Sequence, residues 1–339
     1  MLPAPEPIDE IGGLDPRALP DALLCSATPV VARGLVSAWP MVQAGRRSAQ
    51  AGIDYLKRFD SRAMPVTATV APPEAGGRVY YNDDLSGFNF RREQVPLSVA
   101  LDTLRKYLDA PAPPSIYVAS TTLDTFLPGF RGENDVGLGE RDPLASIWVG
   151  NRSRIAAHQD VPDNLACVVA GRRRVTLFPP EQLENLYIGP LDHTPAGQAV
   201  SLVDFAAPDT DRFPRFAEAL RHARSAVLEP GDAVFIPSMW WHHMEGLEAF
   251  NVLVNYWWRR SPAWRDTPMN ALMLAIMSVR DLPAHERAIW KDVFDHYVFD
   301  YDEAEDAGHV PEAARRVLGP LDEARVRHLR ALLVQRLNR

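Results

Sequence analysis

The chain has 339 residues, of which 46% are hydrophobic and 24% charged, and its formal net charge is −8. This length and composition suit one large domain with an appendage or two modest domains, and the acidic balance argues against a nucleic-acid partner because it repels phosphates. Cys25 and Cys167 lie too far apart for a disulfide framework, and no signal-like N-terminus or membrane-spanning apolar run is evident, so we expect a cytoplasmic protein without a membrane partner.

The N-terminal third mixes helical and extended patterns. Residues 1–28 are rich in proline and acidic side chains and are expected to form an irregular lead-in. A short strand, a turn and the start of a helix are predicted over residues 29–40. Helices are also predicted over residues 51–60 and 95–109, with an alternating strand over residues 64–73 between them.

The texture changes over residues 115–258. Short apolar runs such as SIYVAS, ASIWVG and LACVVAG are separated by Gly, Pro and Asp. Many short strands with turn signals between them predict a mainly β fold, either an antiparallel sandwich or a barrel. Residues 181–223 interrupt the series and are expected to cover one end or edge of it.

The C-terminal part is predicted to be helical, with helices over residues 262–282, 284–299 and 321–338. Six apolar residues of the last helix fall close to one stripe: Leu321, Val326, Leu329, Leu332, Leu333 and Leu337. Such a helix needs a surface to pack against, either the β domain or a second copy of itself. The predicted division is a lead-in (residues 1–28), a β domain (residues 29–260) and a C-terminal helical region (residues 261–339).

Two residues with metal-ligand chemistry, His158 and Asp160, lie just before an apolar run. Residues i and i+2 of a strand share a face, so an imidazole and a carboxylate can reach one point. A third ligand completes the facial triad that suits non-haem Fe(II). The later stretch LEPGDAVFIPSMWWHHMEG offers one in His242 or His243. Each part alone also fits a simpler interpretation, a solvated histidine beside a turn aspartate or histidines packed in a core.

The segments HQDVPDN, GRRRVTLFPPEQLENLYIGP and LEPGDAVFIPSMWWHHMEGLEAFNVLVNYWW resemble the Jumonji-C, cupin-type 2-oxoglutarate oxygenases. Within that family they resemble most the asparaginyl hydroxylase that inhibits hypoxia-inducible factor and its bacterial cupin-like relatives. The resemblance implies a double-stranded β-helix (jelly-roll, cupin) core with flanking helices. It also implies Fe(II) held by His158, Asp160 and His242, with His243 pointing away from the metal.

An enzyme of this family holds the far carboxylate of 2-oxoglutarate on a lysine, and Arg173 occupies the matching position here. Strand alternation independently puts Arg173 on the face of Val175 and Leu177, while Arg172 and Arg174 face solvent. Arginine binds a carboxylate through a rigid fork and is longer than lysine, so either the cosubstrate shifts or the pocket holds a different acid. The alternative is that all three arginines only solubilise a hairpin.

Other positions match family residues near the cosubstrate. A buried Asn255 within VLVNYWW needs a hydrogen-bond partner, which favours a role in the site. The segment before His158 is one residue longer than the family pattern, which puts Ile155 at a usual Ser or Thr position. Ordinary strand packing fits two of the matches, Tyr117 and Thr121, equally well. The full set of predicted cosubstrate contacts besides Arg173 is Tyr117, Thr121, Asn164, Asn255 and Trp257.

The resemblance implies oxidative decarboxylation of 2-oxoglutarate to succinate and CO₂, coupled to hydroxylation of a C–H bond in a protein, peptide or amino-acid side chain. One alternative is another cupin metalloenzyme, an isomerase or a 2-oxoglutarate-independent dioxygenase, with an extra ligand from His193 or His222. Another is a cupin shell that binds a ligand without turnover, and lysine demethylation is a third. Residues 76–90, GGRVYYNDDLSGFNF, fit a recognition loop at the entrance or a plain surface hairpin. The C-terminal helices predict a homodimer.

Overall fold

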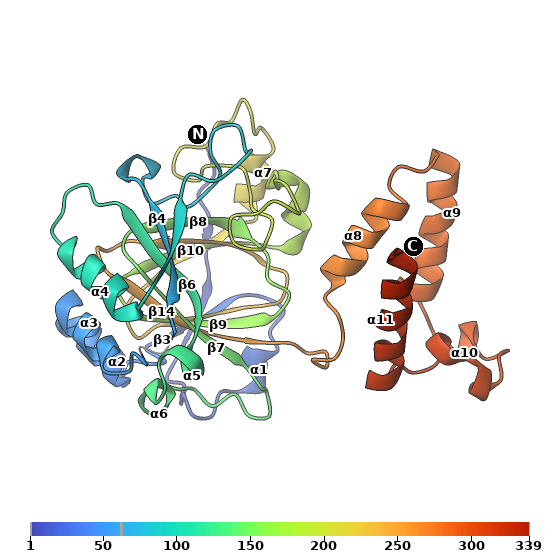
Figure 1. Cartoon of the computed structure of the whole chain (residues 1–339), viewed down its shortest axis with the longest axis horizontal. Helices are drawn as coiled ribbons and strands as arrows, with labels where there is room; N and C mark the ends of the chain where they lie inside the picture. Colours follow the sequence, from blue (N-terminus) through green and yellow to red (C-terminus); the bar gives the residue numbers. More distant parts are fainter. Residues whose placement is uncertain (1, 62–63, 339) are drawn as a thin grey trace. The chain divides into compact units, whose positions relative to one another are not determined.

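The structure, a computed structural model, describes residues 2–61 and 64–338; residues 1, 62, 63 and 339 lie outside the described part. The chain divides into two compact units, Met1–Trp258 and Arg259–Arg339. The first unit contains two β-sheets with helices around them, and the second unit is helical (Figure 1).

The two sheets have five and nine strands, in the orders β1-β11-β10-β13-β8 and β2-β3-β12-β9-β14-β7-β6-β4-β5. β1 pairs with β11 and β2 with β3 in parallel, and the other neighbours are antiparallel. The smaller sheet consists of β1 (Glu6–Pro7), β8 (Ser153–His158), β10 (Arg173–Phe178), β11 (Arg224–Leu228) and β13 (Trp241–Gly246). The larger consists of β2 (Asp9–Gly12), β3 (Val30–Arg33), β4 (Val66–Ala71), β5 (Arg91–Val95), β6 (Ser115–Thr122), β7 (Leu144–Gly150), β9 (Asp163–Ala170), β12 (Ala233–Ile236) and β14 (Asn251–Trp258).

Apolar side chains of both sheets meet in one interior. Val175 and Leu177 of the smaller sheet belong to the same buried cluster as Val168, Val234 and Leu253 of the larger one. Alternate residues along each strand point into this space, so removing their apolar surface from water holds the sheets face to face. The predicted β core of the jelly-roll type is therefore confirmed.

The opposite face of the larger sheet is covered by a second apolar core that includes residues of the N-terminal helices. Trp39 precedes Pro40 at the first position of α2, where a proline needs no hydrogen-bond donor. Ser48 caps α3 by accepting a hydrogen bond from Ala51 N. The helices of this unit are α1 (Asp21–Leu24), α2 (Pro40–Arg47), α3 (Ala49–Lys57), α4 (Leu97–Lys106), α5 (Leu123–Phe126), α6 (Phe130–Glu133) and α7 (Phe216–Arg221).

Residues 2–28, predicted as part of an irregular lead-in, are mostly irregular but also contain short strands. They contribute β1 to one sheet and β2 to the other, and Ile8 between these strands is only 2% exposed. Ion pairs from Asp9 to Arg224 and from Glu10 to Arg33 hold the two edges. Strands of two and four mostly polar residues carry no alternation, so the pairing depends on partners distant in sequence.

The segment between β10 and β11 lies against the smaller sheet. Its residues form a buried cluster with Phe178 of β10 and Trp241 of β13. Phe213 and Phe216 supply aromatic packing to this cluster. The predicted role of residues 181–223 as a cover for one part of the β series agrees with this packing.

The second unit contains α8 (Pro268–Ser278), α9 (Ala284–Phe294), a π segment (Asp295–Phe299), α10 (Glu303–Asp306) and α11 (Glu323–Leu337). Helices therefore occur where the sequence predicts them. Of the described residues in this unit only Ala307 is buried. The predicted stripe of α11 is partly exposed, since Leu333 and Leu337 have exposed fractions of 37% and 55%. Across the described chain, no helix has both the length and the apolar character needed to cross a bilayer.

Candidate metal centre

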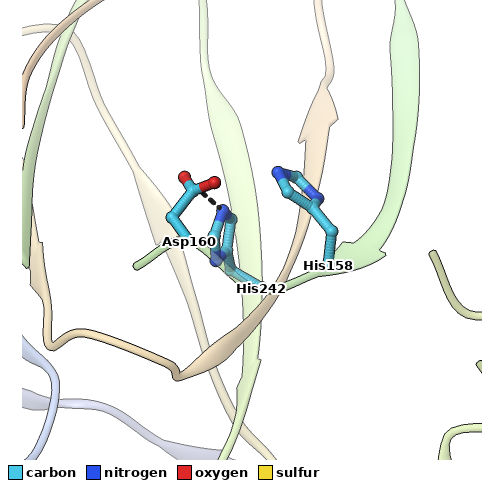
Figure 2. A group of neighbouring side chains, drawn as sticks. All are labelled: His158, Asp160 and His242. Carbon is cyan, nitrogen blue, oxygen red and sulfur yellow. Dashed lines mark ion pairs between the residues drawn. The ribbon is translucent and has the colours of Figure 1, made fainter. Parts of the chain in front are cut away.

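Two strands of the smaller sheet bring three candidate metal ligands together. β8 ends at His158, and β13 places His242 directly opposite it. Asp160 follows His158 by two residues, and its Oδ2 lies 3.5 Å from Nε2 of His242. Figure 2 shows the three side chains turned toward one space. Their ligand atoms all lie within 4.8 Å of one another, and no other described group of three His, Cys, Asp or Glu residues does so.

Backbone carbonyls fix the orientation of both imidazoles. His158 Nδ1 lies 2.9 Å from the carbonyl oxygen of Ala156, and His242 Nδ1 lies 3.1 Å from that of Trp240. A carbonyl oxygen can only accept, so each Nδ1 carries the proton and donates it. Each Nε2 is thereby left with a lone pair for a metal, which is the usual way that outer contacts orient histidine ligands.

The three side chains are electrostatically coupled. Burial, assisted by the nearby His242, lowers the pKa of His158 to about 4. Burial raises the pKa of Asp160, but its hydrogen bond and charge interaction with His242 outweigh this and leave the pKa below its ordinary value. The same interaction outweighs burial at His242 and raises its pKa. A divalent cation can replace the proton that His242 and Asp160 share, because metal ligands bind in their deprotonated forms.

The turn before β13 is tied to the loop after β8. Met239 N donates to the carbonyl oxygen of Asp160 at 2.9 Å, and Gln159 Nε2 donates to the carbonyl oxygen of Met239 at 2.8 Å. Met239 has a φ of 67°, a left-handed conformation that residues other than glycine rarely adopt. These bonds hold Asp160 beside the strand that carries His242.

The two adjacent histidines of β13 point to opposite faces of the sheet, because the strand pairs regularly with β10 across both residues. The bulge in the pairing with β8 has its extra residue in β8, between Ile155 and His158. His243 stacks on Phe205 with ring centroids 4.4 Å apart, and neither of its ring nitrogens has a hydrogen-bond partner among the described residues. Burial lowers the pKa of His243 to about 3. His243 therefore lies on the sheet face away from the cluster, as the sequence predicts.

The two histidines considered as extra ligands lie elsewhere. His193 stacks on Phe88 with ring centroids 4.7 Å apart, and His222 Nε2 lies 3.1 Å from Glu218 Oε1. The donor set is thus two imidazoles and one carboxylate. This set fits Fe(II) with coordination positions left open for small ligands.

Arg173 is buried inside the β domain without a carboxylate partner. It is 2% exposed, and alternation along β10 puts it on the inner face with Val175 and Leu177. Among the described residues no acidic group interacts with its guanidinium, and its Nε has no hydrogen-bond partner. Burial lowers the pKa of Arg173, and the neighbouring Tyr117 partly offsets this. A buried cation without a counter-ion is costly, so the space around it favours an anionic ligand.

The hairpin turn sorts the arginine triplet into one inward and two outward residues. Gly171 adopts a φ of 67°, which reverses the chain between β9 and β10. Arg172 and Arg174 are exposed, and each pairs with a glutamate. The predicted inward direction of Arg173 therefore agrees with the structure.

Tyr117 lies on β6 beside the arginine. Burial raises its pKa to about 12, and the neighbouring Arg173 only partly offsets this. The Tyr117 ring also contacts Trp148, with centroids 5.9 Å apart. Of the two β6 residues predicted to contact the cosubstrate, Tyr117 is the one that the structure places at Arg173.

A second bulge turns Thr121 to the other face of the sheet. The pairing of β6 with β7 shifts between Val118 and Thr121, so Thr121 stands opposite Ile147. Ile147 belongs to the core under the helices, and directly opposed residues share a face. The Thr121 hydroxyl donates to the carbonyl oxygen of Ala119 at 3.3 Å. The structure thus does not bring Thr121 to the inner face with the other predicted cosubstrate residues.

The two predicted asparagines meet on the inner face of the larger sheet. Asn255 Nδ2 donates to Asn164 Oδ1 at 3.3 Å, and Asn255 Oδ1 accepts from Trp148 Nε1 at 2.7 Å. Trp257 meets Trp148 edge to face, with ring centroids 5.7 Å apart. Sequence reasoning did not single out Trp148, because in ASIWVG it resembles any strand tryptophan. Only alternation along β7 could have indicated that it points inward.

Comparison with known proteins identifies the family of this chain. A family model described as a cupin-like domain matches residues 16–263 of the chain. The chain belongs to the cupin-like, Jumonji-C-type oxygenase family. The resemblance drawn from the sequence is thereby confirmed, and the His-Asp-His cluster of this cupin-like chain fits iron.

Relatives with quite different names share parts of this cupin-like chain. It is 39% identical over 106 residues to tRNA wybutosine-synthesizing protein 5 of Danio rerio, covering 31% of the chain and 29% of that protein. It is 34% identical over 131 residues to HSPB1-associated protein 1 of Homo sapiens, covering 38% and 25%. It is 26% identical over 247 residues to lysine-specific demethylase 8 of Xenopus tropicalis, covering 70% and 49%. The chain thus spans less than half the length of each of these relatives.

Proposed function

We propose that this cupin-like protein is an Fe(II)- and 2-oxoglutarate-dependent oxygenase that hydroxylates a C–H bond. The observation that carries the proposal is a buried cation without a counter-ion, Arg173, on the same interior face as a metal ligand. In the register of β10 with β13, Leu177 lies opposite His242, and Arg173 is four residues before Leu177 on that face. A dicarboxylate that chelates a metal at one end and meets a guanidinium at the other fits such a pair of sites.

The protein side chains have separate tasks in this proposal. His158, Asp160 and His242 would hold Fe(II), which together with 2-oxoglutarate and O₂ supplies the oxidation chemistry. Arg173 binds the far carboxylate through two parallel N–H donors. Tyr117 is a protonated phenol at neutral pH, and burial raises its pKa further, to about 12, so its hydroxyl can donate to the same carboxylate. The apolar interior around these groups excludes water.

Residues 76–90 are proposed to form the rim through which a substrate approaches. Tyr80 and Tyr81 share a buried cluster with Ala156 of β8 and with Val200. Val200 in turn forms a β-bridge with His158. Its only β structure consists of the isolated bridges Arg78–Arg154 and Tyr81–Phe88. Its packing along the strand that ends at a metal ligand supports the entrance interpretation.

The rim presents flat aromatic faces. Phe90 stacks on Phe88 with ring centroids 5.1 Å apart, and Phe88 stacks on His193. The guanidinium of Arg92 lies 5.3 Å from the centroid of Phe90. Such faces bind side chains by stacking and cation–π contacts. The net charge of the whole chain is −8, which disfavours a nucleic acid. The aromatic rings and the acidic chain together favour a protein, peptide or amino-acid substrate.

We also propose a homodimer through the C-terminal helices. On α8, Met269, Leu272, Met273 and Met277 recur at helical spacing, with exposed fractions of 42%, 45%, 36% and 67%. A continuous apolar stripe on a helix in a unit almost without buried residues is typical of a surface that needs a partner. A second copy supplies the same stripe by symmetry.

Succinate formation tests the proposed reaction. The wild-type protein should release succinate from 2-oxoglutarate only when Fe(II) and O₂ are present, even slowly in the absence of a substrate. Arg173→Leu should abolish this release, whereas Arg174→Leu, which removes a neighbouring exposed arginine, should not. Oxygen consumption without succinate would instead favour a 2-oxoglutarate-independent dioxygenase. Stimulation of release by a tRNA pool but not by a peptide pool would contradict the proposed substrate class.

A further inference from the structure

Three side chains on the inner face of the larger sheet form a hydrogen-bonded chain. Trp148 Nε1 donates to Asn255 Oδ1 at 2.7 Å, and Asn255 Nδ2 donates to Asn164 Oδ1 at 3.3 Å. They come from β7, β14 and β9, which are neighbours in the sheet. Asn255 is 1% exposed and Asn164 is 5% exposed, so the two amides meet away from bulk solvent.

The chain has a direction, and Trp148 sets it. An indole N–H can only donate, so the Asn255 side chain must turn its oxygen toward Trp148 and its NH₂ toward Asn164. Asn164 then accepts with its oxygen, and its own NH₂ becomes the free end. Among the described residues this NH₂ has no hydrogen-bond partner. The two amide orientations, which are otherwise interchangeable, are thereby fixed from one end.

The opposite orientation would present a different group to the site. If Asn255 were flipped, its NH₂ would face the indole N–H, donor against donor, and its oxygen would accept from Asn164. The free end of Asn164 would then be a carbonyl oxygen, which repels an anion. Asn164 Nδ2 is not among the fully buried atoms that lack a partner, so this NH₂ reaches accessible space, where a ligand oxygen can accept from it.

Trp148 is itself held in place by aromatic neighbours. Trp257 meets it edge to face at an interplanar angle of 89°, and Tyr117 packs on its other side at 32°. Tyr117 is the residue beside Arg173. Trp148 therefore contacts Tyr117, the neighbour of Arg173, through its ring, and it contacts the asparagine pair through its N–H.

We propose that Trp148 is a positioning residue. It sets the direction of the asparagine pair so that Asn164 presents an N–H donor to an oxygen of the anionic ligand bound between the metal cluster and Arg173. This inference rests on the proposed function, because that function supplies the ligand, 2-oxoglutarate. Trp148 acts only through Asn255 and Asn164 and takes no part in the reaction.

The test is Trp148→Phe, which keeps an aromatic ring and removes the N–H together with part of the indole. Anaerobic titration of the Fe(II)-loaded protein with 2-oxoglutarate should show affinity about fivefold weaker, which corresponds to one neutral hydrogen bond of about 1 kcal/mol. The maximum of the visible charge-transfer band should shift, because a hydrogen bond to the chelate changes its acceptor level. Affinity for Fe(II) alone should not change. Trp39→Phe, a buried tryptophan at the start of α2, controls for the loss of an indole.

A double-mutant cycle separates positioning from a general packing effect. Asn164→Ala should weaken 2-oxoglutarate binding by itself, and adding Trp148→Phe to it should cause no further loss. An equal loss from Trp148→Phe in both backgrounds, or an unshifted band, overturns the inference. If the wild type binds no 2-oxoglutarate, the proposed function fails and this inference with it; if only the Trp148→Phe effect is missing, the proposed function stands.

A measurement on the wild-type protein tests the same inference if the Trp148→Phe variant does not fold. In the diamagnetic Zn(II)-loaded wild type, 2-oxoglutarate should shift the side-chain amide protons of Asn164 more than those of Asn255 in ¹H–¹⁵N spectra. The reverse pattern, or shifts of neither amide, contradicts the assigned direction.

Discussion

At position 173 a guanidinium stands where the resembled family has an ammonium. Arginine keeps its charge in a buried site, and its planar fork accepts only a narrow range of carboxylate positions. Arg173 is buried beside Tyr117. Among the described residues no acidic side chain neutralises the charge of its guanidinium. The residue is therefore better explained by a ligand than by stability, since a buried charge alone destabilises the fold.

Arg173→Leu should separate stability from binding. The free energy of unfolding of the ligand-free protein should stay unchanged or rise by about 1 kcal/mol, because an apolar side chain replaces an unpaired buried charge. Binding of 2-oxoglutarate should be lost. Thermal unfolding and isothermal titration calorimetry measure the two effects. A destabilised variant that still binds 2-oxoglutarate would contradict the assigned role of Arg173.

A half-buried histidine, His158, and a buried one, His243, make the metal-free protein sensitive to acid. Burial lowers the pKa of His158 to about 4 and that of His243 to about 3, from an ordinary value of 6.5. Between about pH 6.5 and pH 4 the unfolded chain binds protons that the folded chain does not, so the free energy of unfolding falls as the pH is lowered through this window. His243→Phe keeps an aromatic ring against Phe205 and removes one contribution, so the fall should be shallower.

Urea unfolding at a series of pH values measures this slope. The exposed His309, changed to Gln, is the control, because this histidine lies outside the buried clusters, and it should leave the slope as in the wild type. Equal slopes in the wild type and His243→Phe would show that His243 is not a neutral buried group.

At the scale of the elements, the sequence predicts what depends on local periodicity. Alternation along β10 agrees with the inward direction of Arg173. His158 shares a face with Ile155 only because the pairing of β8 with β13 shifts between them, which alternation does not predict. Thr121 could not be placed this way, because a bulge between β6 and β7 changes which residues face inward. A bulge depends on the partner strand, and the sequence of one strand does not record it.

The pairing of strands that are distant in the sequence could not be predicted from the sequence either. β1 and β2 are short polar segments whose pairing with β11 and β3 has no local signal. Trp148 carries no motif, and its importance appears only when β7, β14 and β9 lie side by side. The three candidate metal ligands could be predicted because their spacing is itself a chemical signal, whereas the residues that support them are brought together by the order of the strands.

The turn that carries Arg173 offers a prediction at this scale. A Cβ at Gly171 would lie 2.4 Å from the carbonyl oxygen of Phe250, in addition to requiring a φ of 67°. Gly197 also has a positive φ, 98°, but nothing lies within 4 Å of its Cβ position. Gly197→Ala should therefore cost about 1 kcal/mol from the backbone alone. Gly171→Ala should cost clearly more and should weaken 2-oxoglutarate binding.

Denaturant unfolding of the two variants gives the comparison. Equal destabilisation by Gly171→Ala and Gly197→Ala would mean that the β9–β10 turn is not tightly packed and does not position Arg173.

At the scale of the whole molecule, the chain is similar in sequence to proteins that have quite different names. A tRNA wybutosine-synthesizing protein, an HSPB1-associated protein and a lysine-specific demethylase all match parts of this chain. Membership of the family therefore does not identify the substrate of this chain, because function depends on the site built upon a fold. We propose that the rim of residues 76–90 contributes to the choice of substrate.

The helical unit predicts a dimer that a single surface change can disrupt. Leu272→Glu and Met273→Glu on α8 should each give a monomer, because a charge within a desolvated apolar stripe is unfavourable. Val99→Glu, at an exposed apolar site of the β domain, should leave the mass unchanged. Sedimentation or light scattering of the full chain measures the state. A dimer that persists in both α8 variants, or a monomeric wild type, would contradict the proposal.

We propose that His158, Asp160 and His242 hold Fe(II) beside a binding site for 2-oxoglutarate. Anaerobic titration of the protein with Fe(II) and then 2-oxoglutarate tests it most directly, followed by the visible charge-transfer band of the metal chelate. The wild type should develop the band at one equivalent of each, and Asp160→Ala should not. A wild type without the band, or an Asp160→Ala variant with the same band, would contradict the account.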